Sequence, residues 1–75
     1  MPFIDIKVIE GVFTPEERRE LVERVSETVI AFEGEALRPA TVTVVTESPS
    51  GSWALGGQAL TTEDVRAMQA AGAAA

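Results

Sequence analysis

The sequence predicts an α/β fold: a single β-α-β unit with parallel strands and a short C-terminal hairpin and helix, its sheet completed by oligomerisation. Segments 2–10 and 41–47 show the alternating, β-branched pattern of strands and flank one long amphipathic segment, 15–33. This connection is long enough for parallel pairing, which is almost always right-handed. A chain of 75 residues without cysteine buries little and has no disulfides, so partner subunits are the expected source of stability.

The first strand is expected over residues 2–10. Its two faces alternate as Ile4, Ile6, Val8 on one side and Phe3, Asp5, Lys7, Ile9 on the other. Pro2 has no backbone N–H to give a sheet and is tolerated at the first residue of a strand. A strand-start proline without chemistry is therefore one interpretation of Pro2.

The helix of residues 15–33 has clear start and stop signals. Thr14 is the expected N-cap, Pro15 the first helical residue, and Glu17 the third, which is a capping box. Gly34 is the expected stop. The apolar stripe is predicted to comprise Leu21, Val25, Thr28, Val29 and Phe32.

The C-terminal third holds the second strand, 41–47, then a turn and the short segment "SWALGG". Arg38 precedes Pro39 and is expected to be extended. A short helix capped by Thr61 or Thr62 follows, and the tail 69–75 is expected to fray. We therefore expect residues 1–60 to form the β-α-β domain and residues 61–75 a C-terminal helix with a flexible, alanine-rich tail.

One helix covers only one face of a two-stranded sheet. The opposite face carries Phe3, Ile9 and some of the valines, and two strands rarely stand alone. Sheets from two or more chains are therefore expected to join edge to edge and to stack.

Composition excludes several classes of function. The net charge of −6 argues against nucleic acid or an anionic membrane surface as partner. Without His or Cys, an ordinary zinc or transition-metal site is not expected. No apolar run approaches the roughly 18 residues of a membrane span, and the start lacks the features of a signal peptide. A cytoplasmic protein is expected.

Five landmarks occur in order: Pro2, the strand that closes in "IEG" (9–11), the capped helix, the strand "VTVVTE" (42–47), and "GSWALGG" (51–57). Together they resemble the 4-oxalocrotonate tautomerase family, whose late segment reads glycine, any residue, aromatic, small, aliphatic, Gly-Gly. The resemblance implies a cofactor-independent tautomerase that begins with a catalytic proline and assembles as a hexamer, a trimer of dimers. Its substrate would be a small enol or keto acid.

The resemblance also implies the catalytic role of Pro2. Removal of Met1 would leave a secondary amine on the ring, and a pocket that lowers its pKa would suit it to general acid/base work near neutrality. Phe3, Ile9, Trp53 and Leu55 are the expected apolar wall, in part from a neighbouring subunit. The same amine could form an iminium with a carbonyl. Isomerisation, dehalogenation, hydration and carbon–carbon bond chemistry therefore stay open.

Two family arginines that grip substrate carboxylates are missing here. Their positions are Val12 and Val42 or Thr43. Arg38 is the alternative candidate for binding a substrate anion, because its planar guanidinium can bind a carboxylate through two hydrogen bonds. The other interpretation of Arg38 is a solvated cation in a loop. The missing pair fits either a changed substrate or a non-catalytic assembly subunit of a hetero-oligomeric complex.

Overall fold

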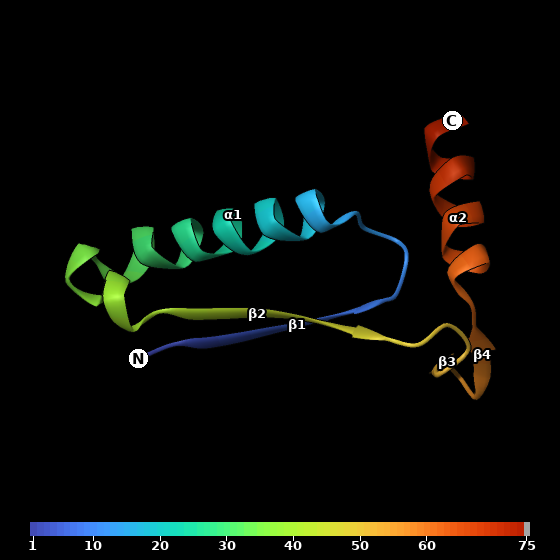
Figure 1. The fold of residues 1–75 in the computed structure, drawn as a ribbon, viewed down its shortest axis with the longest axis horizontal. Helices are drawn as coiled ribbons and strands as arrows, with labels where there is room; N and C mark the ends of the chain where they lie inside the picture. The colour runs from blue at the N-terminus through green and yellow to red at the C-terminus, as the bar shows by residue number, and fades with distance from the viewer. Residues whose placement is uncertain (75) are drawn as a thin grey trace. The chain divides into compact units, whose positions relative to one another are not determined.

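The computed structural model describes residues 1–74 (Figure 1). In chain order its elements are β1 (Phe3–Ile9), α1 (Pro15–Glu33), the 3-10 helix η1 (Glu35–Ala40), β2 (Val42–Ser48), β3 (Trp53–Leu55), β4 (Gln58–Leu60) and α2 (Thr62–Ala74). The predicted β-α-β order followed by a hairpin and a helix is confirmed.

The contacts within the chain divide it into two compact units. The first comprises residues 1–6 and 13–46, and therefore α1, η1 and the beginnings of β1 and β2. The second comprises residues 7–12 and the chain from Glu47 onward, and therefore the ends of both strands, the β3–β4 hairpin and α2. The C-terminal segment expected from residue 61 lies in this second unit together with the hairpin.

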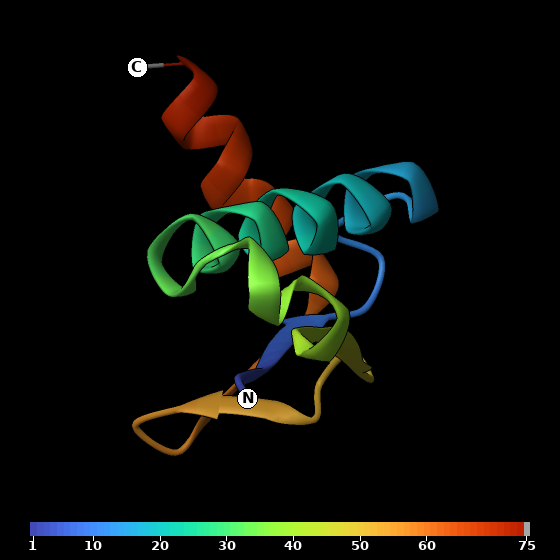
Figure 2. The same cartoon turned by 90° about the vertical axis from the view of Figure 1, so that its left-hand side faces the viewer.

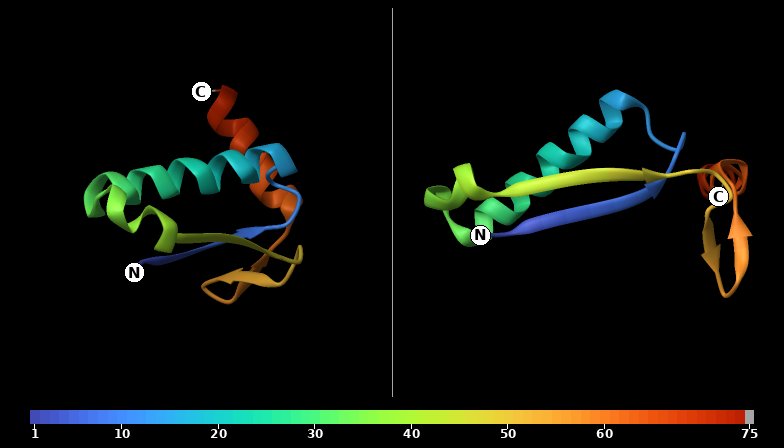
Figure 3. Two further views of the ribbon diagram at one scale, coloured as in Figure 1. Left: turned by 60° about the vertical axis from the view of Figure 1, so that its left-hand side comes forward. Right: turned by 60° about the horizontal axis from the view of Figure 1, so that its bottom comes forward.

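β1 and β2 pair in parallel, as predicted. At their beginnings the Val42 N–H donates to the Pro2 carbonyl at 3.2 Å. At their ends the Glu10 N–H donates to the Ser48 carbonyl at 2.9 Å. Figure 3 shows the two strands side by side, with α1 along one face of their beginnings. Pro2 thus lies just before the strand and contributes its carbonyl, which needs no N–H.

The alternation predicted for β1 is confirmed over most of the strand. Ile4, Ile6 and Val8 are half-buried, whereas Phe3 is 68% exposed. Ile9 departs from the expectation that it lies on the open face. It is only 6% exposed and belongs to the core of the second unit.

The termini of α1 are those predicted from its capping residues. The Glu17 N–H donates to Thr14 Oγ1 at 3.1 Å, and the Thr14 N–H donates to Glu17 Oε1 at 2.8 Å. Pro15 opens the helix, and Gly34 ends it with a φ of 104° that side-chain-bearing residues rarely adopt. The capping box is confirmed.

The stripe predicted on α1 is wrong at two of its five positions. Thr28 and Phe32 are exposed, Phe32 to 90%, whereas Ile30 is 5% exposed. The buried face consists of the rows 21–25–29 and 22–26–30. The Ser26 hydroxyl bonds that of Thr43 on β2 at 2.6 Å. This contact places the 22–26–30 row against the sheet.

The prediction that Arg38 is extended is wrong, because the residue lies inside η1. The Leu37 N–H donates to the Gly34 carbonyl and the Thr41 N–H to the Arg38 carbonyl, both with 3-10 spacing. Pro39 is compatible with this turn, since its fixed φ near −65° falls within the 3-10 range. The Arg38 side chain also bonds Glu35 one turn earlier.

β3 and β4 form a tight antiparallel hairpin (Figure 2). Trp53 lies opposite Leu60 and Leu55 opposite Gln58, so the loop is the two residues Gly56 and Gly57. Their φ values are 56° and 83°, which fits the type I′ turn that matches strand twist. The unusual backbone angles predicted for this pair are confirmed.

α2 is capped by Thr61, one of the two candidates. The Asp64 N–H donates to Thr61 Oγ1 at 3.1 Å, and the Thr61 N–H donates to Asp64 Oδ2 at 2.9 Å. The tail expected to fray is helical as far as Ala74, and Ala75 lies outside the described residues. Within residues 1–74, no helix combines the length and apolar character needed to cross a membrane.

Candidate functional site

An open depression of about 640 Å³ lies beside Pro2 in the first unit. Its lining comprises Met1, Pro2, Val29, Phe32, Glu33 and Leu37. α1 runs back against the parallel strands, so its last turns return to the point where β1 begins. The sequence thereby places a proline against a mostly apolar surface that contains a single carboxylate.

Pro2 is half-buried, and its carbonyl is fixed by the Val42 N–H. While Met1 is attached, the ring nitrogen is a tertiary amide and has no basic lone pair. Removal of Met1 converts that nitrogen into a secondary amine, which can accept and return a proton. The position of Pro2 therefore allows acid/base chemistry only in the processed chain.

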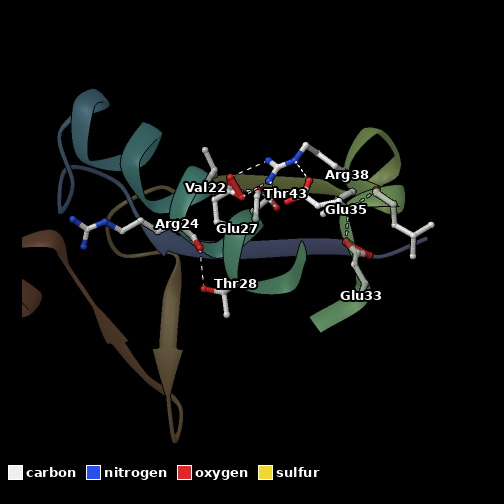
Figure 4. Close-up of polar contacts among 11 residues, drawn as sticks. Val22, Arg24, Glu27, Thr28, Glu33, Glu35, Arg38 and Thr43 are labelled. Carbon is white, nitrogen blue, oxygen red and sulfur yellow. Dashed lines mark hydrogen bonds and ion pairs between the residues drawn. The ribbon is translucent and has the colours of Figure 1, made fainter. Parts of the chain in front are cut away.

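Glu33, at the end of α1, was not predicted as a site residue. Its Oε2 accepts a hydrogen bond from Thr41 Oγ1 at 2.5 Å (Figure 4). Its Oε1 is buried and has no hydrogen-bond partner among the described residues. One signal was present in the sequence: a glutamate in the last helical turn opposes the helix dipole, and Glu33 directly precedes the stop residue Gly34.

Arg38 borders a different depression, of about 790 Å³, whose lining shares no residue with that beside Pro2. Its guanidinium bonds Glu27 in a bidentate manner at 2.9 Å and Glu35 through Nε and Nη2 at 2.8 and 3.0 Å (Figure 4). These hydrogen bonds raise the pKa of Arg38 above its ordinary value, and the bond to Glu35 has the larger effect. These bonds engage four of the five N–H donors of the guanidinium, so a substrate anion would have to displace a carboxylate to bind Arg38 in a bidentate manner.

The other three predicted site residues belong to the second unit. Ile9 is buried there. Trp53 is half-buried on β3, and Leu55, two residues later, is 61% exposed. The structure thus places Pro2 and Arg38 in the first unit and the expected apolar residues Ile9, Trp53 and Leu55 in the second.

The positions of the two missing arginines carry no positive charge. Val12 is half-buried, Val42 is partly exposed at the start of β2, and Thr43 bonds Ser26. The Gly11 carbonyl beside Val12 accepts a hydrogen bond from the Arg66 guanidinium of α2 at 2.5 Å. Neither Gly11 nor Val12 therefore has a positive charge that could bind a substrate carboxylate.

The chain thus combines a β-α-β unit, a hairpin and a C-terminal helix with a proline beside an apolar depression just before the first strand. The family profile described as tautomerase enzyme matches residues 2–63, so the chain belongs to the tautomerase family.

Solved structures agree with this assignment. Apo unFused 4-OT is 32% identical, with a TM-score of 0.69 over 84% of this chain and 97% of the other. DmpI from Helicobacter pylori is 31% identical, with a TM-score of 0.66 over 88% and 97%. TomN, a 4-oxalocrotonate tautomerase homologue in the tomaymycin biosynthetic pathway, is 25% identical, with a TM-score of 0.69 over 88% and 95%. No curated protein matched.

Proposed function

We propose that the chain, once Met1 is removed, is a cofactor-independent tautomerase that interconverts the enol and keto forms of a small carbonyl acid. Pro2 is the general acid/base. The observation that carries the proposal is the position of Pro2 on the apolar depression formed by α1 and η1 in a tautomerase-family chain. A cytoplasmic location is part of the proposal.

The neutral amine takes the proton from the enol hydroxyl, and the resulting ammonium returns it to a carbon of the conjugated system. This gives the ketone and restores the amine. A terminal amine has an ordinary pKa of about 7.7–8.0, and a secondary amine is more basic. Once a neighbouring subunit covers the depression, the apolar side chains Val29, Phe32 and Leu37 disfavour the ammonium and lower this pKa toward the working range.

Assembly completes the site in this proposal. The depression beside Pro2 is open in one chain, and the apolar side chains Phe3, Val42 and Val44 are exposed on the adjoining sheet face. A neighbouring subunit covers this face, and its Trp53 and Leu55 side chains complete the apolar wall around Pro2. The expected assembly is a hexamer, arranged as a trimer of dimers.

The test is ketonisation of phenylenolpyruvate by protein whose intact mass shows the loss of Met1. Replacing Pro2 by alanine is expected to lower kcat/KM by about 100-fold or more, because general acid/base catalysis contributes about 10²–10⁴-fold. Pro49→Ala is the matched control, since Pro49 is an exposed loop residue. Equal rates for wild type and Pro2→Ala would remove Pro2 from the mechanism.

A non-catalytic assembly subunit is the second candidate. It is favoured by the absence of a cation at Val12 and Val42, and by the pairing of Arg38 with two carboxylates. Co-purification with a companion chain that carries both arginines, and no turnover by this chain alone, would support it. Enol turnover by a homo-oligomer would exclude it.

A further inference from the structure

We propose that Glu33 is a positioning residue that accepts a hydrogen bond from the protonated Pro2 amine and holds that amine in the depression. This inference rests on the proposed function, because the amine exists only after Met1 is removed. It adds a carboxylate partner for the proline.

Both groups are tied to the start of β2. The Pro2 carbonyl accepts from the Val42 N–H at 3.2 Å, and Glu33 Oε2 accepts from the hydroxyl of the preceding residue, Thr41, at 2.5 Å. Thr41 Oγ1 also lies 2.9 Å from the Leu37 carbonyl of η1. Two consecutive residues therefore fix the proline and the carboxylate on the same depression.

The second oxygen of Glu33 lacks a partner. Oε1 is buried and accepts no hydrogen bond from the described residues. A buried polar atom left unpaired is costly, so such atoms are rare in native proteins. Apart from Glu33, the lining side chains are those of methionine, proline, valine, phenylalanine and leucine, none of which donates a hydrogen bond.

Removal of Met1 creates a donor on this depression. The Pro2 nitrogen has no N–H as an amide, one as a neutral amine and two as an ammonium. A carboxylate and an ammonium form the shorter and stronger class of hydrogen bond. Glu33 Oε1 is thus the acceptor for the N–H of the Pro2 amine, a donor that exists only after Met1 is removed.

This pairing has a measurable electrostatic effect. The apolar wall disfavours the ammonium, whereas a neighbouring carboxylate favours it. Glu33 is the charged side chain of the lining, and the nearby Glu35 and Arg38 of η1 pair with each other. Loss of the Glu33 charge should therefore lower the pKa of the Pro2 amine.

The experiment is an NMR titration of processed protein labelled with ¹⁵N-proline. In Glu33→Gln, the pKa of the Pro2 amine is expected to fall by about one or more relative to wild type, the usual effect of a close opposite charge. Glu23→Gln is the matched control: it removes the same charge from an exposed position on α1, ten residues away, and should change this pKa far less. An identical Pro2 pKa in wild type and Glu33→Gln would overturn the inference.

Activity gives a second readout. The neutral amine is the base, so the rising limb of kcat/KM against pH should move to lower pH in Glu33→Gln by the same amount as the NMR pKa, and Glu33→Asp should restore part of the difference. If Glu33→Gln does not fold, the ¹³C signal of the Glu33 carboxyl in wild type serves instead. It should respond at the Pro2 pKa, and its failure to respond would overturn the inference.

The two proposals fail separately. Enol turnover that depends on Pro2, with a Pro2 pKa unaffected by Glu33→Gln, would refute the role of Glu33 and leave the tautomerase proposal intact. A Pro2 pKa that falls in Glu33→Gln, in a protein that turns over no enol, would support the pairing and refute the tautomerase proposal.

Discussion

Thr41 and Glu33 are joined by a hydrogen bond from the threonine hydroxyl to Oε2 of the carboxylate, at 2.5 Å. The bond links the start of β2 to the last turn of α1. It satisfies one oxygen of a carboxylate whose residue lines the depression beside Pro2, and the other oxygen is buried without a hydrogen-bond partner among the described residues. The contact therefore supports the fold and orients a carboxylate at the candidate site.

Thr41→Val should destabilise the protein by about 1–3 kcal/mol, because it removes the donor and leaves Glu33 Oε2 without its partner. The shape of the side chain is nearly unchanged. Urea unfolding at fixed protein concentration measures the free energy of unfolding. Thr28→Val on the exposed side of α1 is the control and should have little effect. Equal stability of Thr41→Val and wild type would show that this contact contributes nothing.

The bond between Ser26 and Thr43 should show energetic coupling, because the two hydroxyls are partly buried and lie 2.6 Å apart. Ser26→Ala and Thr43→Val each leave one hydroxyl without this partner and should each cost about 1 kcal/mol or more. The double variant should cost less than the sum, with a coupling of about 0.5–1 kcal/mol in a double-mutant cycle. Strict additivity would mean that the bond does not fix the rotation of α1.

Acid should remove the contribution of the Arg38–Glu35 pair to stability. The hydrogen bond from Arg38, and then its charge, hold the pKa of Glu35 below its ordinary value of 4.5. A carboxyl whose pKa is lowered by folding stabilises the folded state above its unfolded pKa, and the effect is lost as the pH falls through its folded pKa.

The difference in unfolding free energy between wild type and Glu35→Gln should therefore shrink as the pH falls below about 4.5. In an Arg38→Ala background the same comparison should show much less dependence on pH. A difference that stays constant with pH in the wild-type background would show that the pair does not shift the titration of Glu35.

Val44→Lys should weaken self-association, because Val44 is an exposed apolar residue on the sheet face that we propose is covered by a neighbouring subunit. Burial of an unpaired ammonium is unfavourable. Sedimentation velocity over a dilution series should show a dissociation constant raised by about tenfold or more, equivalent to about 1.4 kcal/mol. Thr28→Lys, on the exposed side of α1, is the control and should assemble like wild type. Unchanged assembly of Val44→Lys would place the interface elsewhere.

The local signals in the sequence predicted the order and the ends of the main elements. Thr14 and Gly34 delimit α1 through short-range rules of capping and backbone conformation, and the structure follows those rules. The rotation of α1 was predicted less well, because a helical stripe can drift by one position without violating its period. Phe32, which was predicted on the stripe, is exposed, whereas Ile30, which was not, is buried; the row that faces the sheet is marked by the Ser26–Thr43 contact, formed across 17 residues of sequence.

The candidate site was predicted in part. Pro2 could be selected from its position and the family landmarks, and the structure places it on an apolar depression. Glu33 could not be selected from spacing alone, since its environment depends on Thr41, which lies eight residues later, just beyond the 3-10 helix η1 that was not predicted. Likewise, the two carboxylates that engage Arg38 come from α1 and η1, which only the folded chain brings to one guanidinium.

The central claim is that a free Pro2 nitrogen performs the chemistry, and controlled removal of Met1 tests it most directly. Protein that retains Met1 is treated with a methionine aminopeptidase, while intact mass and the rate of phenylenolpyruvate ketonisation are followed together. The account predicts that the Met1-bearing chain is inactive and that the rate rises in proportion to the fraction of chains that have lost Met1. A Met1-bearing chain that ketonises the enol as fast as the processed chain would contradict it.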